Sequence, residues 1–221
     1  SPLYIVGPRG IKRALSAMMV LWEGLPYRLV VLEKPAGCFS INSDILREIE
    51  ISTLDLDHST ECLGYSLYFK RNREFDIDKA LENQVPKRLW RHLQAGQTFY
   101  VDDVSYTPDM VLGKPRPGIK FSYITDTRPI DAIIPFIESS RLFVCEAMYG
   151  DDLDIGKAVK NKHMTFREAA NLAYRGQVDQ LLLTHFSPSL DSPSDYIENA
   201  SSVFKNTSLA YDGINISIGY P

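Results

Sequence analysis

The stretch Leu181-Leu182-Leu183-Thr184-His185-Phe186-Ser187 joins a short apolar run to a histidine. Such a run predicts a buried strand, and the histidine would stand directly at its end. Four other apolar runs end in a similar way, at Asp57-His58, Thr125-Asp126-Thr127, Cys145-Glu146 and Tyr211-Asp212. Helical segments separate the runs, so we expect a layered α/β fold whose strands deliver imidazoles and carboxylates to one edge of a sheet.

Periodicity and capping signals place the remaining elements. The expected strands are Leu3–Val6, Leu29–Leu32, Leu46–Asp57, Leu63–Phe69, Lys120–Ile124, Leu142–Val144 and Gln180–Leu183. A helix is expected over Ile11–Trp22. A second helix begins with a capping box at Thr165-Phe166-Arg167-Glu168, and its apolar face follows at i, i+3, i+4 and i+7. His163 therefore stands just before a helix N-terminus, where exposed amides favour anions.

Composition limits the class of protein. The 221 residues are 44% hydrophobic and 24% charged, which is typical of one globular domain over residues 1–221. No apolar run approaches the roughly 18 residues that a membrane span needs, so no membrane association is expected. The three cysteines, Cys38, Cys62 and Cys145, are scattered without C-x-x-C spacing. They indicate a reducing compartment, which we expect to be the cytoplasm, and argue against a disulfide framework and a thiolate zinc site.

Charge is unevenly distributed along the chain. The net charge is −4, but Lys70 to Arg91 contains seven basic and four acidic residues, a local balance of +3. Two short helical patterns, split by Val85-Pro86, occupy this region. A solvated pair of charged helices would explain it, and so would a basic surface for nucleic acid.

The residue types at the strand ends suit divalent metals. Imidazole nitrogens and carboxylate oxygens bind zinc, and two such ions can neutralise charge on a phosphate. Each residue alone also has an ordinary structural explanation: His58 and His185 as solvated residues, Asp126 as a turn residue, Glu146 as a helix start. The residues by themselves indicate a metal-dependent hydrolase without deciding its ligands.

Five segments resemble motifs of the ribonuclease Z family, the endonucleases that trim the 3′ end of precursor tRNA. Lys160–Thr165, followed by Glu168-Ala169-Ala170, resembles the family's histidine-serine-threonine loop, and Leu181–Ser187 resembles its late histidine motif. The other three are similar to the glycine-aspartate-threonine segment, the histidine-glutamate-alanine-threonine segment and a metal-histidine motif: Ser122–Thr127, Val144–Ala147 and Asp57-His58-Ser59. They occur in family order and span essentially the whole chain.

The resemblance implies a metallo-β-lactamase αββα sandwich with a flexible arm inserted at residues 70–96. The family's histidine-x-histidine-x-aspartate-histidine motif, which supplies three ligand histidines and a general-base aspartate, does not occur in these 221 residues. Ser1-Pro2 also leads straight into an apolar strand. We therefore expect a truncated or processed chain, a sandwich incomplete at its N-terminus, and a partly exposed core.

Site residues follow from the same resemblance. It implies two divalent metal ions, expected to be zinc with manganese left open, with His58 on the first, Asp126 bridging both and His185 on the second. His163 would lie near the scissile phosphate as the catalytic residue, and Glu146 and Asp212 would orient the ligand imidazoles. The arm would grip the tRNA elbow through its basic residues, Lys70, Arg71, Arg73, Lys87, Arg88 and Arg91. The implied partners are precursor tRNA and a second copy of the chain, in a homodimer.

Three departures from the family pattern leave alternatives open. Phe186-Ser187 stands where the family has an arginine-tyrosine pair, Thr125 replaces a glycine, and Lys87-Arg88 replaces glycine-proline. One alternative is a small-molecule phosphodiesterase or sulfatase of the same superfamily. The other is a catalytically inactive RNA-binding scaffold, against which the joint retention of all four predicted metal and catalytic residues weighs.

Overall fold

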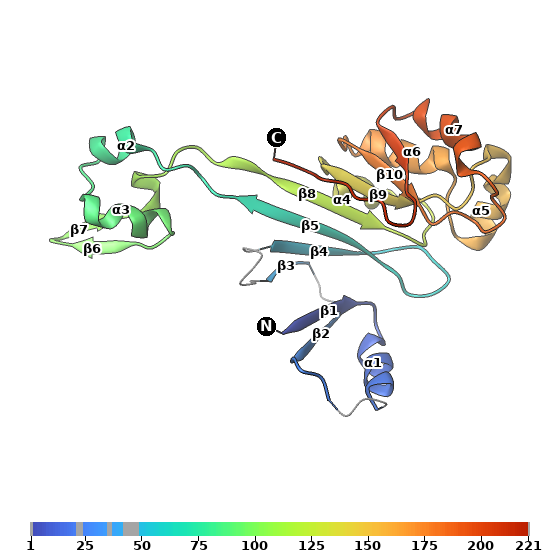
Figure 1. The fold of residues 1–221 in the computed structure, drawn as a ribbon, viewed down its shortest axis with the longest axis horizontal. Coiled ribbons are helices and arrows are strands. Elements are labelled where there is room, and N and C mark those ends of the chain that lie inside the picture. Colours follow the sequence, from blue (N-terminus) through green and yellow to red (C-terminus); the bar gives the residue numbers. More distant parts are fainter. Residues whose placement is uncertain (1, 21–23, 35–36, 42–48, 221) are drawn as a thin grey trace. The chain divides into compact units, whose positions relative to one another are not determined.

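The structure, a computed structural model, describes residues 2–20, 24–34, 37–41 and 49–220 (Figure 1). Among these residues, seven strands form one mixed sheet in the order β11-β10-β9-β8-β5-β4-β3. Four neighbouring strands run parallel: β8 (Arg116–Ile124), β9 (Leu142–Glu146), β10 (Leu181–Thr184) and β11 (Thr207–Leu209). Parallel strands end at the same edge of a sheet, so residues that follow β8, β9 and β10 lie close together.

Three antiparallel strands complete this sheet: β3 (Cys38–Ile41), β4 (Ile49–Asp55) and β5 (Leu63–Arg71). β4 and β5 lie where strands are predicted, and the predicted residues 46–48 lie outside the described part of the chain. The sequence prediction misses β3, a four-residue strand at the sheet edge whose Ser40 interrupts any apolar run.

The first residues form a separate parallel pair. β1 (Leu3–Gly7) and β2 (Leu29–Glu33) are joined through α1 (Ile11–Met19), as the sequence predicts. The expected helix runs further, to Trp22, but α1 ends at Met19 and residues 21–23 are not described. None of the helices in the described part of the chain has the length and apolarity that a membrane crossing requires.

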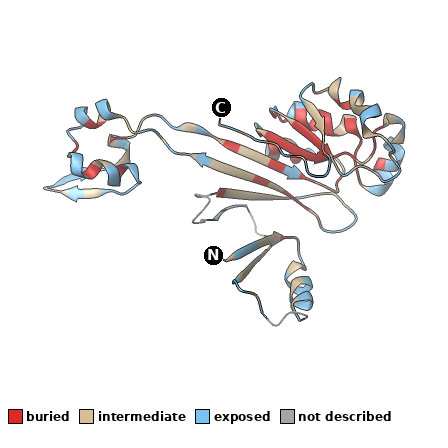
Figure 2. Cartoon of the chain, viewed as in Figure 1, coloured by how far each residue is buried: buried red, intermediate tan, exposed pale blue. Residues whose placement is uncertain are grey.

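The main core lies on one face of the parallel strands (Figure 2). Side chains alternate along β9 and β10, so Phe143, Cys145, Leu181 and Leu183 point to this face. They pack in one buried cluster with two helices, α4 (Ile133–Ile137) and α6 (Phe166–Arg175). This packing fixes the strands whose ends carry the candidate site.

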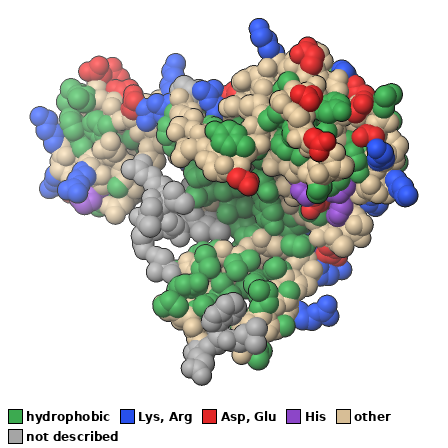
Figure 3. Space-filling model, turned by 45° about the vertical axis from the view of Figure 1, so that its right-hand side comes forward, with side chains coloured by type: hydrophobic (Ala, Val, Ile, Leu, Met, Phe, Trp, Pro, Cys, Tyr) green, Lys and Arg blue, Asp and Glu red, His purple; other side chains and the backbone are tan. Residues whose placement is uncertain are grey.

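The opposite face of the sheet is also apolar. Its buried residues Leu142, Val144 and Leu182 contact the C-terminal segment through Ile214, Ile216 and Ile218. Tyr123 of β8 remains 39% exposed, as expected for a sheet face that is only partly covered. Figure 3 shows hydrophobic side chains, in green, exposed on the side of the molecule that it presents.

Two helices flank His163. α5 (Ile155–Asn161) ends at Lys162, which has a left-handed backbone (φ 59°). α6 begins with the predicted capping box: Thr165 Oγ1 accepts from the Glu168 amide at 3.2 Å, and Glu168 Oε2 accepts from the Thr165 amide at 2.9 Å. His163 is thus held in a short connection that is anchored at both ends. α7 (Ile197–Ser201) follows a short 3-10 helix, η3 (Pro193–Tyr196), and precedes β11.

Residues Arg71–Gly118 form a compact unit of their own. It contains two helices and a hairpin: α2 (Ile77–Glu82), α3 (Lys87–Gln94), β6 (Phe99–Val101) and β7 (Val104–Tyr106). The predicted arm ends at Gly96, where the helical pattern stops. The compact unit continues to Gly118 because the hairpin and Val111 complete its small core. Asp102 and Asp103 make the hairpin turn with positive φ angles of 49° and 60°.

The packing of α4 against α6 gives a stability prediction. A Cβ at Gly176 would lie 2.6 Å from Ile137 Cγ1 in the core, whereas a Cβ at Gly156, in exposed α5, would meet nothing within 4 Å. We expect Gly176→Ala to destabilise the fold by roughly 1–3 kcal/mol through overpacking. Gly156→Ala should stabilise it by about 0.5–1 kcal/mol because alanine favours helices. Urea unfolding measures both, and shifts in the same direction would contradict the packing described.

Candidate metal centre

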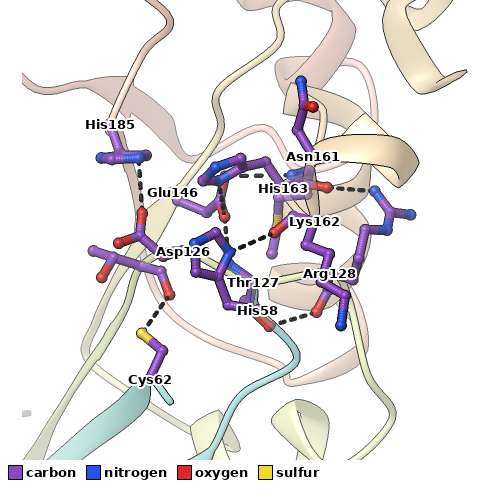
Figure 4. Close-up of polar contacts among 12 residues, drawn as sticks. His58, Cys62, Asp126, Thr127, Arg128, Glu146, Asn161, Lys162, His163 and His185 are labelled. Atoms are coloured by element: carbon purple, nitrogen blue, oxygen red, sulfur yellow. Dashed lines mark hydrogen bonds and ion pairs between the residues drawn. The ribbon is translucent and has the colours of Figure 1, made fainter. Parts of the chain in front are cut away.

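Three predicted site residues converge at the C-terminal edge of the parallel strands (Figure 4). Asp126 follows β8, His185 follows β10, and His163 reaches the same place from the connection between α5 and α6. Their ligand-type atoms all lie within 4.8 Å of one another. Residues 37 and 22 positions apart in sequence therefore form one cluster that could hold a metal ion.

Asp126 and His185 form the exposed side of this cluster. Both have left-handed backbones, with φ angles of 44° and 59°. Non-glycine residues adopt this conformation uncommonly, and such residues concentrate at functional sites. His185 Nε2 lies 2.7 Å from Asp126 Oδ1. The two atoms meet without hydrogen-bond alignment, and Oδ1, a buried atom, accepts no hydrogen bond from any described residue. A buried carboxylate oxygen that faces imidazoles and receives no hydrogen bond fits a divalent cation.

Glu146 lies behind the cluster at the end of β9 and is completely buried. Its Oε1 accepts from the Thr127 amide at 2.6 Å and contacts His163 Nδ1 at 2.9 Å, while its Oε2 accepts from the Met164 amide at 3.3 Å. Burial raises the pKa of Glu146 to about 7, although the two amide donors lower it. Burial also lowers the pKa of His163, and the nearby His58 acts in the same direction. Both shifts follow from removal from water, which disfavours each charged form.

His58 lies beside these residues. Its ligand atoms are not part of the cluster formed by Asp126, His163 and His185. Its ring centroid is 5.0 Å from that of His163, which in turn is 5.4 Å from that of His185. His58 Nδ1 lies 3.2 Å from the Lys162 carbonyl oxygen, so Nδ1 carries the proton and Nε2 is left for a ligand. Lys162 Nζ is paired with Asp57 Oδ1 at 2.7 Å, which fixes the same loop.

Asp212 is not brought into this cluster. It is exposed in the turn that follows β11, and no hydrogen bond or ion pair of the described residues joins it to a site histidine. Its expected role in orienting an imidazole therefore stays a prediction. Two more residues contact the site and are not among the predicted site residues. The Arg128 guanidinium donates to the His163 carbonyl oxygen, and the Lys162 carbonyl oxygen faces His58 Nδ1. The sequence marks them only by their positions, because Lys162 directly precedes His163 and Arg128 follows Asp126 by two residues.

The six basic residues expected to bind substrate have different surroundings. Arg73 donates to the carbonyls of Gly113 and Leu112 and to Asp109. Its guanidinium therefore links two segments of the compact unit and is already occupied by these partners. Lys70 is paired with Glu50 at 2.8 Å, and Arg71 stacks over the Tyr220 ring. Lys87, Arg88 and Arg91 are exposed on α3. Of the six, these three are the most available to an anionic partner.

The fold and the cluster together define a class of protein. The crystal structure of the metallo-β-lactamase fold protein YhfI from Bacillus subtilis matches with a TM-score of 0.58 at 15% identity, covering 96% of this chain and 63% of that one. Human tRNase Z, short form, matches with a TM-score of 0.60 at 20% identity, covering 99% and 68%. No family model matches the chain. The chain therefore has the metallo-β-lactamase fold that its motifs predict.

Sequence similarity to other proteins identifies the family within this fold class. The ribonuclease Z of Clostridioides difficile (strain 630) is 60% identical over 220 residues, which cover 100% of this chain and 72% of that protein. This chain belongs to the ribonuclease Z family. The predicted family is confirmed, and with it an enzyme of the hydrolytic endonuclease class. The cluster of Asp126, His163 and His185 could hold a divalent metal ion.

Proposed function

We propose that the protein is an endoribonuclease that processes the 3′ end of precursor tRNA. The reaction would hydrolyse the phosphodiester after the discriminator nucleotide and leave a 3′-hydroxyl. The observation that carries this proposal is 60% identity along the whole chain to a ribonuclease Z. The cluster of Asp126, His163 and His185, behind which Glu146 is buried, supports it with the residue types that phosphodiester hydrolysis needs.

We propose two zinc ions as the resident metal. His58 would hold the first, Asp126 would bridge both and His185 would hold the second. The family's remaining ligands belong to the upstream histidine-rich motif, so the complete centre would need that motif as well. When bound, the ions would activate water and neutralise charge on the phosphate.

His163 has the setting of a proton donor. Its Nδ1 contacts the buried Glu146 carboxylate at 2.9 Å, so the ring is oriented and Nε2 is the atom left for substrate. A carboxylate on one imidazole nitrogen stabilises the positive charge of the protonated ring. We propose that Nε2 donates a proton or hydrogen bond to the leaving oxygen, while Glu146 keeps the ring in place.

We propose that the compact unit Arg71–Gly118 includes the tRNA-binding arm. The guanidiniums and ammonium of Lys87, Arg88 and Arg91 lie on one short helix, and buried Leu89 and Leu93 fix the helix on the unit's core. An exposed basic helix surface of this kind suits a phosphate backbone. A homodimer, in which the arm of one protomer grips tRNA bound at its partner, and a cytoplasmic location are part of the same proposal.

His163→Ala tests the proposed reaction. In the full-length protein, wild type should cleave a precursor tRNA to a product ending in a 3′-hydroxyl. The variant should bind as much zinc as wild type but cleave about 10²–10⁴-fold more slowly, because it loses proton transfer and keeps the proposed ligands His58, Asp126 and His185. Elemental analysis and single-turnover cleavage measure the two effects. Loss of zinc together with cleavage would instead make His163 a ligand, and a wild type that leaves precursor tRNA intact would refute the function.

The proposed role of the arm in tRNA binding can be tested by removing its positive charges. Replacing Lys87, Arg88 and Arg91 with glutamine should weaken precursor tRNA binding and flatten its dependence on salt, because three phosphate contacts are lost. Turnover of a small chromogenic phosphodiester should stay at the wild-type rate. Arg141→Gln is a matched control that should leave tRNA binding unchanged. It also removes a basic charge, but its exposed ion pair with Asp179 lies outside the compact unit Arg71–Gly118. Equal loss of both activities in the triple variant would contradict the role of the arm.

A further inference from the structure

Arg128 joins the two loops that carry the site. It follows Asp126 by two residues, and its guanidinium reaches the start of α6 (Figure 4). Nη1 donates to Glu168 Oε2 at 2.9 Å and to the His163 carbonyl oxygen at 2.5 Å, and Nη2 donates to Glu168 Oε1. The two side chains are only 18% and 21% exposed. A half-buried bidentate pair of this kind is both stronger and more directional than a surface ion pair.

The partners of Arg128 control the backbone beside His163. Glu168 also accepts from the Thr165 amide, so the ion pair and the capping box share one carboxylate. The His163 carbonyl is thereby fixed from one side, while its amide donates to the Ala158 carbonyl at 2.9 Å from the other. The preceding Lys162 carbonyl accepts from His58 Nδ1. Moving this short segment would therefore displace both imidazoles.

We propose that Arg128 is a positioning residue that sets His163 and His58 relative to Asp126. Its Nη1 group is used by Glu168 and by the His163 carbonyl, so it acts through these groups and not on the substrate. The inference rests on the proposed function for its effect on cleavage, and on the candidate metal centre for its effect on zinc.

A second arginine also pairs with a carboxylate between α6 and the loop that contains Arg128, but on the surface. Arg175, on α6, pairs with Asp131 of the loop that contains Arg128, at 3.3 Å. These two side chains are 57% and 90% exposed, and neither contacts His163. Arg175→Gln is therefore the matched control for the loss of an arginine–carboxylate pair between this loop and α6.

The test compares Arg128→Gln, Arg128→Lys and Arg175→Gln in the full-length protein. Zinc affinity is measured without RNA, by competition with a chelating dye. Steady-state cleavage of precursor tRNA then gives kcat and KM. Arg128→Gln should lower kcat about 10–100-fold with KM within about threefold of wild type, and should weaken zinc binding about 10-fold or more. Arg128→Lys should show a smaller loss of the same kind, because lysine keeps the charge but not the planar fork. Arg175→Gln should match wild type.

Wild-type kcat and zinc affinity in Arg128→Gln would overturn the proposal, and so would equal losses in Arg175→Gln. If Arg128→Gln does not fold, Arg128→Lys decides, because wild-type kcat in that variant would show that the fork is not needed. A wild-type protein that binds zinc but leaves precursor tRNA uncut would refute the proposed function, while the zinc affinities would still decide the role of Arg128.

Discussion

The buried carboxylate of Glu146 connects the two loops on which the candidate site depends. A fully buried carboxylate is costly unless hydrogen-bond donors surround it. Here the donors are the Thr127 amide, which directly follows Asp126, the His163 imidazole and the Met164 amide. Satisfying one side chain of β9 therefore fixes both the β8 loop and the connection between α5 and α6. The position of the site follows from the need to satisfy this group.

The parallel sheet supplies the rest of the geometry. Because β8, β9 and β10 run in parallel, Asp126, Glu146 and His185 emerge at one edge without long loops. The helices α4 and α6 hold these strands from the core face. Left-handed backbones at Asp126 and His185 then turn the two side chains toward each other. A rigid frame with strained residues at its edge is a common way to hold groups ready for a ligand.

Much of this arrangement could be predicted from the sequence, because apolar runs and capping signals are local. The runs before Asp126, Glu146 and His185 are strands, and the capping box correctly places His163 before a helix. Asp212 has the same local signal but lies exposed, since β11 is a three-residue edge strand followed by a turn into solvent. The end of a strand can be predicted from the sequence, but the direction in which the next residue points cannot.

Other features depend on contacts between distant residues and leave no local trace. Arg73 and Arg88 look alike in a basic segment, but Arg73 is fixed by partners about 40 residues away and Arg88 is exposed. Arg128 resembles a turn residue before Pro129, and only the fold brings Glu168 and the His163 carbonyl to it. The hairpin of β6 and β7 belongs to the compact unit because its core needs it, although no helical pattern continues there.

The central claim is that strand-end residues far apart in the chain share a bound cation. Anomalous diffraction at the zinc absorption edge, from crystals of the zinc-loaded full-length protein, tests it most directly. We expect an anomalous peak in contact with both the Asp126 carboxylate and the His185 imidazole. Crystals that bind zinc elsewhere, and leave these two side chains paired only with each other, would contradict the account.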